Sequence, residues 1–195
     1  MATREDWLMS LVDEVRPLFE AHTGAPLPAR IRVACGFPSS ARRSGAIGEC
    51  WADASSKDGH FEILVSPVLD DPRIVAATLI HELCHSLPGS MNHSKTFAAH
   101  AGNMGLAPGG AKGWKATGPG ADFDSRYGAI LSALGAYPHA QLLMSEKPRQ
   151  TTRMLKAVCP SCGYTVRLTK KWADLGLPLC HQDGEQFALE TSDEE

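Results

Sequence analysis

The sequence predicts an α+β fold, in which helices lie beside a small antiparallel sheet and a short β-rich module follows. Two observations lead to this prediction. Apolar residues recur at helical spacing in residues 4–21, in a segment that begins at Asp71, and after Ser94. Short alternating or apolar runs, bounded by turn residues, predict three strands over residues 31–35, 46–51 and 61–65.

Length and composition limit the class of protein. A chain of 195 residues predicts one domain, or one domain with a small appendage. The hydrophobic fraction of 43% and the charged fraction of 21% are typical of globular proteins. No run of 18 apolar residues and no apolar leader is present, so we expect no membrane contact and a cytoplasmic location. In such a reducing compartment the six cysteines favour metal binding over disulfides.

The elements before residue 70 have recognisable boundaries. Thr3 and Asp6 form a capping box at the start of the first helix, and Pro17 predicts a kink or an interruption within it. Residues 38–45 are expected to form a loop, and residues 53–59 a polar turn between the second and third strands.

The next helix carries the most specific motif of the chain. Asp71 is its expected N-cap, and the helix should end near Pro88. It contains His81-Glu82-Leu83-Cys84-His85, and residues four apart lie on one helix face, so both imidazoles can bind one metal ion. This spacing predicts a zinc site in which Glu82 is the catalytic general base. The alternative is a buried helix whose histidines only pack or form hydrogen bonds.

A catalytic zinc ion usually has three protein ligands, so a third ligand is needed. We favour His93, which directly precedes the helix cap Ser94, over His100, which lies two turns into that helix. The glycine-rich residues 102–120 are expected to form a long loop that could cover the site. Residues 127–134 predict a short helix, and a linker with a domain boundary near residue 146 follows.

Residues 147–190 predict a second metal-binding module. Cys159 and Cys162 form a Cys-x-x-Cys-Gly knuckle, and Cys180 follows after a strand at 165–168 and a turn at 170–172. Paired ligands about twenty residues apart are typical of a zinc ribbon, whose structural zinc stabilises so short a segment. The sequence leaves the fourth ligand open between Asp183 and His181, and it also allows a ribbon without zinc. An acidic tail, residues 191–195, ends the chain.

Charge is unevenly distributed, although the net charge of −3 argues against general nucleic-acid binding. Residues 147–173 contain basic residues and no acid; they are Lys147, Arg149, Arg153, Lys156, Arg167, Lys170 and Lys171. Tyr164 and Trp172 are interleaved with them, a combination that suits phosphates and unpaired bases. We therefore treat Lys156, Arg167, Lys170 and Lys171 as candidate DNA contacts, with a solvated surface as the alternative.

Two motifs together resemble a known family. The His81–His85 motif, followed by Asn92-His93-Ser94-Lys95-Thr96-Phe97, resembles the SprT-like metallopeptidases, which include the Spartan proteases, and the later cysteines add to the likeness. Ser94 stands where the family often has glycine, and no fourth cysteine lies near Cys180. The resemblance implies a zincin-like metallopeptidase domain over residues 1–146, a zinc ribbon, and protein substrates on DNA, including DNA–protein crosslinks.

The sequence therefore favours a zinc-dependent metallopeptidase in which His81, His85 and His93 bind the ion and Glu82 transfers protons. One alternative is a nucleic-acid-binding zinc protein whose zincin site is inactive or structural. Another is a zinc hydrolase for non-peptide substrates, because fold does not fix substrate. A second donor to the oxyanion is expected, and either Tyr127 or a backbone amide could serve.

Overall fold

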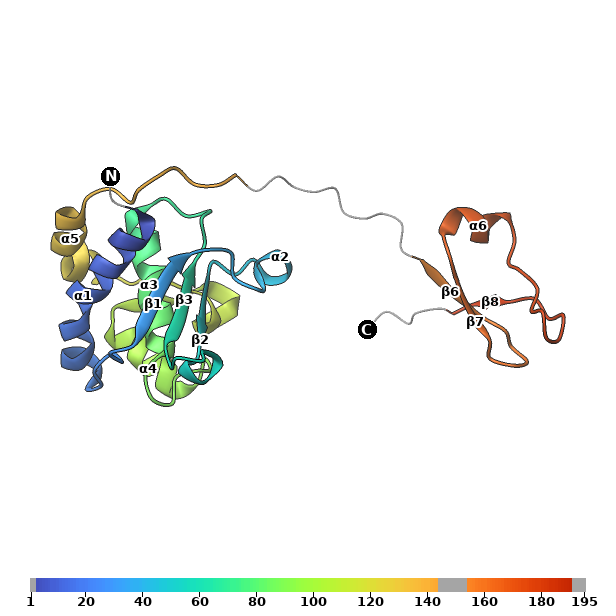
Figure 1. Ribbon diagram of the computed structural model, residues 1–195, viewed down its shortest axis with the longest axis horizontal. Coiled ribbons are helices and arrows are strands. Elements are labelled where there is room, and N and C mark those ends of the chain that lie inside the picture. Colours follow the sequence, from blue (N-terminus) through green and yellow to red (C-terminus); the bar gives the residue numbers. More distant parts are fainter. Residues whose placement is uncertain (1–2, 144–153, 191–195) are drawn as a thin grey trace. The chain divides into compact units, whose positions relative to one another are not determined.

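A computed structural model describes residues 3–143 and 154–190. The chain divides into two compact units, Met1–Met144 and Ser145–Glu195, which are described separately (Figure 1). The predicted boundary near residue 146, the basic residues Lys147, Arg149 and Arg153, and the acidic tail lie outside the described residues. The fold is α+β, as predicted.

Helix α1, Arg4–Thr23, is the first element of the larger unit. Its capping box is confirmed, because the Thr3 side chain accepts from the Asp6 N–H and the Asp6 carboxylate accepts from the Thr3 N–H. The predicted interruption at Pro17 is wrong: the helix continues for six residues beyond it. Both Pro17 and Asp13, whose carbonyl loses its helical donor, are exposed, so water can satisfy that carbonyl.

The sheet of this unit has three strands, in the order β1-β3-β2. They are β1 (Ile31–Cys35), β2 (Gly48–Trp51) and β3 (Phe61–Val65). Strands β2 and β3 are antiparallel, but β1 pairs with β3 in parallel, so the expectation of an antiparallel sheet is wrong for that pair. The loop between β1 and β2, which contains the short helix α2 (Ala41–Ser44), carries the chain past β3 to its far edge.

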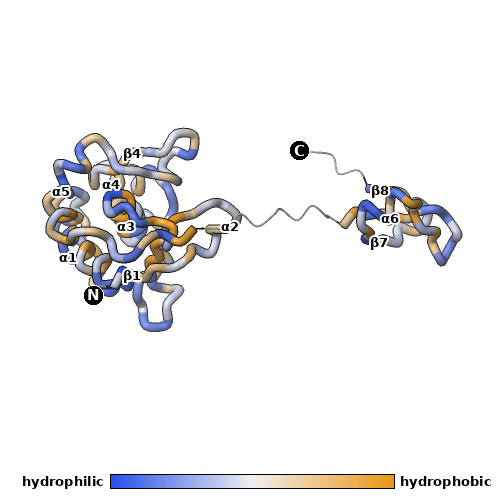
Figure 2. The backbone as a smooth tube through the Cα atoms, turned by 90° about the horizontal axis from the view of Figure 1, so that it is seen from above, coloured by the Kyte–Doolittle hydropathy of each residue, from blue (hydrophilic) through white to orange (hydrophobic). Residues whose placement is uncertain are grey.

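Helix α3, Pro72–His85, packs against the sheet and forms the centre of the core. Asp71 caps it, accepting from the N–H groups of Arg73 and Ile74, and every residue from Val75 to His85 is buried. The tube in Figure 2 is correspondingly hydrophobic along much of α3. Helices α4 (Lys95–Asn103) and α5 (Phe123–Leu134) complete the helical layer together with α1.

The glycine-rich segment is more ordered than a simple loop. Strands β4 (Leu106–Pro108) and β5 (Thr117–Pro119) form an antiparallel hairpin, and the 3-10 segment η2 (Gly110–Lys115) is its tip. Another 3-10 turn, η1 (Asp53–Ser55), connects β2 to β3. Strand β5 packs against α3, so this hairpin forms one side of the region that contains the histidine motif.

The smaller unit has a three-stranded antiparallel sheet in the order β7-β6-β8. Its elements are β6 (Leu155–Val158), β7 (Thr165–Leu168), α6 (Lys170–Leu175) and β8 (Ala188–Leu189). The predicted turn at residues 170–172 is therefore the start of a short helix. Among its described residues, the buried apolar cluster consists of Ala157, Cys159, Cys180 and Phe187. In the described parts of both units, no helix has the length and apolar character needed to cross a membrane.

Candidate metal centres

Three histidines converge at the end of α3. His81 and His85 lie one turn apart on the helix, and His93 approaches from the residues before α4. One ring nitrogen of each lies within 4.8 Å of those of the other two, and Nε2 of His93 is 3.2 Å from Nε2 of His81. This group could hold a metal ion. His100 lies elsewhere, with Nδ1 2.9 Å from the hydroxyl of Ser90.

The opposite nitrogens of two of these rings have fixed partners. Nδ1 of His85 lies 2.8 Å from the carbonyl oxygen of Ser90, which can only accept, so Nδ1 carries the proton and Nε2 keeps its lone pair. Nδ1 of His81 lies 2.8 Å from the hydroxyl of Thr117 on β5. Outer contacts of this kind set the tautomer and orientation of metal-binding histidines, so the donor set fits a divalent metal such as zinc.

Burial keeps the two helical histidines neutral. Burial, with smaller contributions from His85 and His93, lowers the pKa of His81 to about 3. Burial and His93 lower the pKa of His85 to about 4, although the hydrogen bond to Ser90 acts in the opposite direction. Phe97 forms the apolar side of the cluster, with its ring centroid 4.8, 4.4 and 4.9 Å from those of His81, His85 and His93. Neutral imidazole is the form that binds metals.

Glu82 is buried beside the cluster and faces the edge of the sheet. An ideal Cβ at Gly48 would stand 2.9 Å from Cγ and Cδ of Glu82, so the absence of a side chain at position 48 makes room for this carboxyl group. Burial, with a smaller contribution from the negative charge of Glu49, raises the pKa of Glu82 to about 8. Glu49 itself is held by the backbone N–H and hydroxyl of Ser39.

The three histidines line one cleft of about 1110 Å³ together with Glu82, Gly48, Glu49 and Thr117. Its floor is α3, one side is the stretch 45–50 that includes β2, and the other side is the hairpin tip with Lys112 and Lys115. Cys50 on β2 is half-buried and also lines this cleft. Tyr127 is not available as an oxyanion donor, because its buried hydroxyl donates to the carbonyl of Met104.

A second group that could hold a metal ion lies in the smaller unit: Cys159, Cys162, Cys180 and Asp183. The thiols of Cys162 and Cys180 are 3.5 Å apart, and Sγ of Cys159 is 3.4 Å from a carboxylate oxygen of Asp183. The backbone N–H of Glu185 donates to Asp183 and lowers the pKa of its carboxyl group, which favours the ligating carboxylate form.

The backbone explains why Asp183, and not its neighbour His181, joins this group. Segments 159–164 and 180–185 form the same turn: the first N–H donates to the sixth carbonyl, at 2.9 and 2.7 Å. The fifth residue, a glycine with φ of +75° or +74°, donates back to the first carbonyl. Asp183 thus has the position in the second turn that Cys162 has in the first. The repeat Cys-x-x-Cys-Gly and Cys-x-x-Asp-Gly was the available sequence signal.

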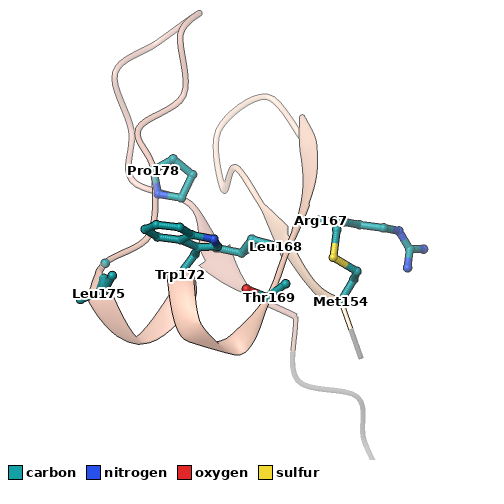
Figure 3. Close-up of a pocket in the computed structure, with 8 residues that line it drawn as sticks. Met154, Arg167, Leu168, Thr169, Trp172, Leu175 and Pro178 are labelled. Atoms are coloured by element: carbon teal, nitrogen blue, oxygen red, sulfur yellow. The ribbon is translucent and has the colours of Figure 1, made fainter. Parts of the chain in front are cut away.

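The four candidate DNA contacts have different surroundings. Lys156 forms an ion pair with Glu190 at 2.7 Å, whereas no carboxylate in the described residues is paired with Arg167, Lys170 or Lys171. Lys171 lies over the ring of Trp172, whose side chain is 58% exposed. Arg167 lies at a groove of about 510 Å³ whose other lining residues include Trp172, Leu168 and Pro178 (Figure 3).

Four residues of the histidine site were missed at the sequence level: Thr117, Ser90, Gly48 and Glu49. No local motif marks them, since each acts through a contact across the fold. Comparison of the chain with protein-family models, with curated proteins and with solved structures gives no match.

Proposed function

We propose that this protein is a zinc-dependent metallopeptidase. One observation carries the proposal: three imidazoles converge in a cleft that the buried side chain of Glu82 also lines. A zinc ion bound by His81, His85 and His93 would supply Lewis acidity, which lowers the pKa of water and polarises a carbonyl oxygen. The resemblance of the sequence to SprT-like metallopeptidases supports the same conclusion.

Glu82 has the role of proton carrier. Its carboxylate accepts a proton from the attacking water and returns it to the leaving amine, which cannot depart as an anion. Gly48 leaves room for this group, and Thr117 and Ser90 hold the adjacent imidazoles in their orientations. A site that served only for structure would need no carboxyl group at this place, which argues against the inactive alternative.

The edge of β2 favours a peptide over another substrate. Strand β2 is at the end of the sheet order, and no described strand pairs with its outer edge. Residues 45–50 also line the cleft next to Glu82. An extended peptide can add to such an edge through backbone hydrogen bonds. This geometry supports peptide hydrolysis over the hydrolysis of small non-peptide molecules.

Proteins associated with DNA are the substrate class that we propose, because the resemblance implies it and three basic residues of the smaller unit have no acidic partner among the described residues. Arg167, Lys170 and Lys171 suit phosphates, and the exposed Trp172 suits stacking on an unpaired base. The test is cleavage of casein by zinc-loaded full-length protein, with and without single-stranded oligo(dT). Cleavage that requires zinc supports the proposal, and stimulation by DNA supports the substrate class.

A further inference from the structure

One side of the cleft is a cationic wall, formed by Lys112 and Lys115 of η2. Both side chains are exposed, and neither ammonium group is paired with a carboxylate in the described part of the chain. Two like charges at the border of a concave site attract an anionic ligand and repel a cationic one. The cationic wall therefore gives the cleft a preference for negatively charged ligands, which the neutral histidines alone would not provide.

The hairpin fixes the position of this wall. Trp114, between the two lysines, packs against the main core, and an ideal Cβ at Gly102 would lie 3.4 Å from its ring. The N–H of Gly109 donates to the carbonyls of Gly113 and Ala116, at 3.1 and 2.6 Å, and closes the tip. The lysines thus flank an anchored residue of the scaffold.

The wall is also close to the histidine cluster. Lys115 precedes Thr117 by two residues, and the hydroxyl of Thr117 lies 2.8 Å from Nδ1 of His81. The positive charge of Lys115 also contributes, after burial, to lowering the pKa of His93. An anionic side chain bound by Lys115 would therefore lie close to the peptide bond that we propose is cleaved with Glu82 as general base.

We infer that the cationic wall selects peptide segments that carry an aspartate or glutamate close to the cleaved bond. This inference rests on the proposed function and names the sequence class of its substrates. A peptide suits the site better than a polyanion, because the described lining of the cleft contains two lysines and also Glu49, whose negative charge repels a chain of phosphates.

The test uses full-length, zinc-loaded protein and a mixture of peptides that carry Asp, Asn or Lys near one central sequence. Mass spectrometry of the products gives relative kcat/KM values. Wild type should favour Asp over Lys peptides, and Lys112→Glu/Lys115→Glu should reverse that preference. Two exposed ion pairs between the lysines and a peptide carboxylate should change the ratio of kcat/KM for Asp and Lys peptides by about threefold to tenfold in each direction. Lys57→Glu, an exposed lysine outside the cleft, should leave the preference unchanged.

Binding separates this inference from the proposed function. Fluorescence anisotropy with the Glu82→Gln variant measures binding of the same labelled peptides without hydrolysis. If the Glu82→Gln variant binds Asp peptides selectively but wild type cleaves no peptide, the proposed peptidase activity is wrong. The selection of acidic segments by the cationic wall would still be supported. Equal binding and cleavage of Asp and Lys peptides would overturn the inference alone. It would also be overturned if Lys112→Glu/Lys115→Glu changed the binding of oligo(dT) but left the preference between Asp and Lys peptides unchanged.

Discussion

The backbone of Gly48 lies directly against the carboxyl group of Glu82, with no space for a methyl group between them. Gly48 is the first residue of the edge strand β2, and Glu82 follows the first histidine of the motif on α3. The contact therefore connects the strand that we expect to hold substrate with the residue that we expect to transfer protons.

This contact predicts that Gly48→Ala displaces the Glu82 carboxyl group. The added methyl group should destabilise the fold by about 1–3 kcal/mol and reduce hydrolysis. Chemical denaturation measures the first effect. Gly118→Ala is the matched control, because nothing lies within 4 Å of a Cβ there, and its effect should stay within about 0.5 kcal/mol. Equal effects of the two changes would argue against a tight contact at Gly48.

The second prediction concerns the third histidine. His93→Ala removes a ligand, whereas His100→Ala removes only a hydrogen bond to the hydroxyl of Ser90. Residues that contact metal ligands without binding the ion typically contribute about 10- to 100-fold to metal affinity. We therefore expect His100→Ala to weaken zinc binding by no more than this factor. His93→Ala should weaken it well beyond that range, measured by competition with a chelator of known affinity. Similar losses in both variants would contradict the ligand set.

The third prediction concerns the smaller unit. Full-length protein should contain a second zinc ion, and Asp183→Ala should release it whereas His181→Ala should not. Asp183→Cys should retain the ion, since the turn already has the geometry of its cysteine counterpart. Elemental analysis measures the zinc content, and hydrogen exchange should show that chelation unfolds residues 155–189. Retention of both ions by Asp183→Ala would show that its carboxylate is not a ligand.

The fourth prediction concerns DNA. Lys170→Ala/Lys171→Ala should weaken the binding of single-stranded DNA and reduce the slope of log K against log salt by up to about 1.4, the value for two phosphates. Zinc-dependent cleavage that needs no DNA should remain. Lys57→Ala/Lys95→Ala removes the same charge from the larger unit and is the control. Unchanged binding at every salt concentration would mean that these lysines form only a solvated surface.

The sequence predicted best what depends on neighbouring residues. The start of α3, its cap Asp71 and the pairing of His81 with His85 all follow from spacing within a few residues, whereas the helix ends at His85, three residues before the expected end near Pro88. The cap at Ser94, which accepts from the N–H of Phe97, is confirmed for the same reason. Local chemistry determines these features, so a single sequence contains the information.

Long-range pairing was less predictable. Alternating residues identify a strand but not its partner, so the parallel pairing of β1 with β3 could not be read from residues 31–35. Thr117, which contacts His81 from 36 residues further along the chain, lies in a stretch predicted as a loop. Gly48 likewise matters only because α3 packs behind it. These contacts result from tertiary packing and have no counterpart in local periodicity.

The most direct test of the proposed activity is the Glu82→Gln variant. Glutamine keeps the size of the side chain but cannot accept a proton, so the variant should retain zinc and the stability of wild type while casein hydrolysis falls by about 10²–10⁴-fold. Glu62→Gln, on β3 and outside the cleft, controls for the loss of a carboxylate and should cleave at the wild-type rate. If zinc-loaded Glu82→Gln cleaves as fast as wild type, Glu82 is not the general base and the proposed mechanism is wrong.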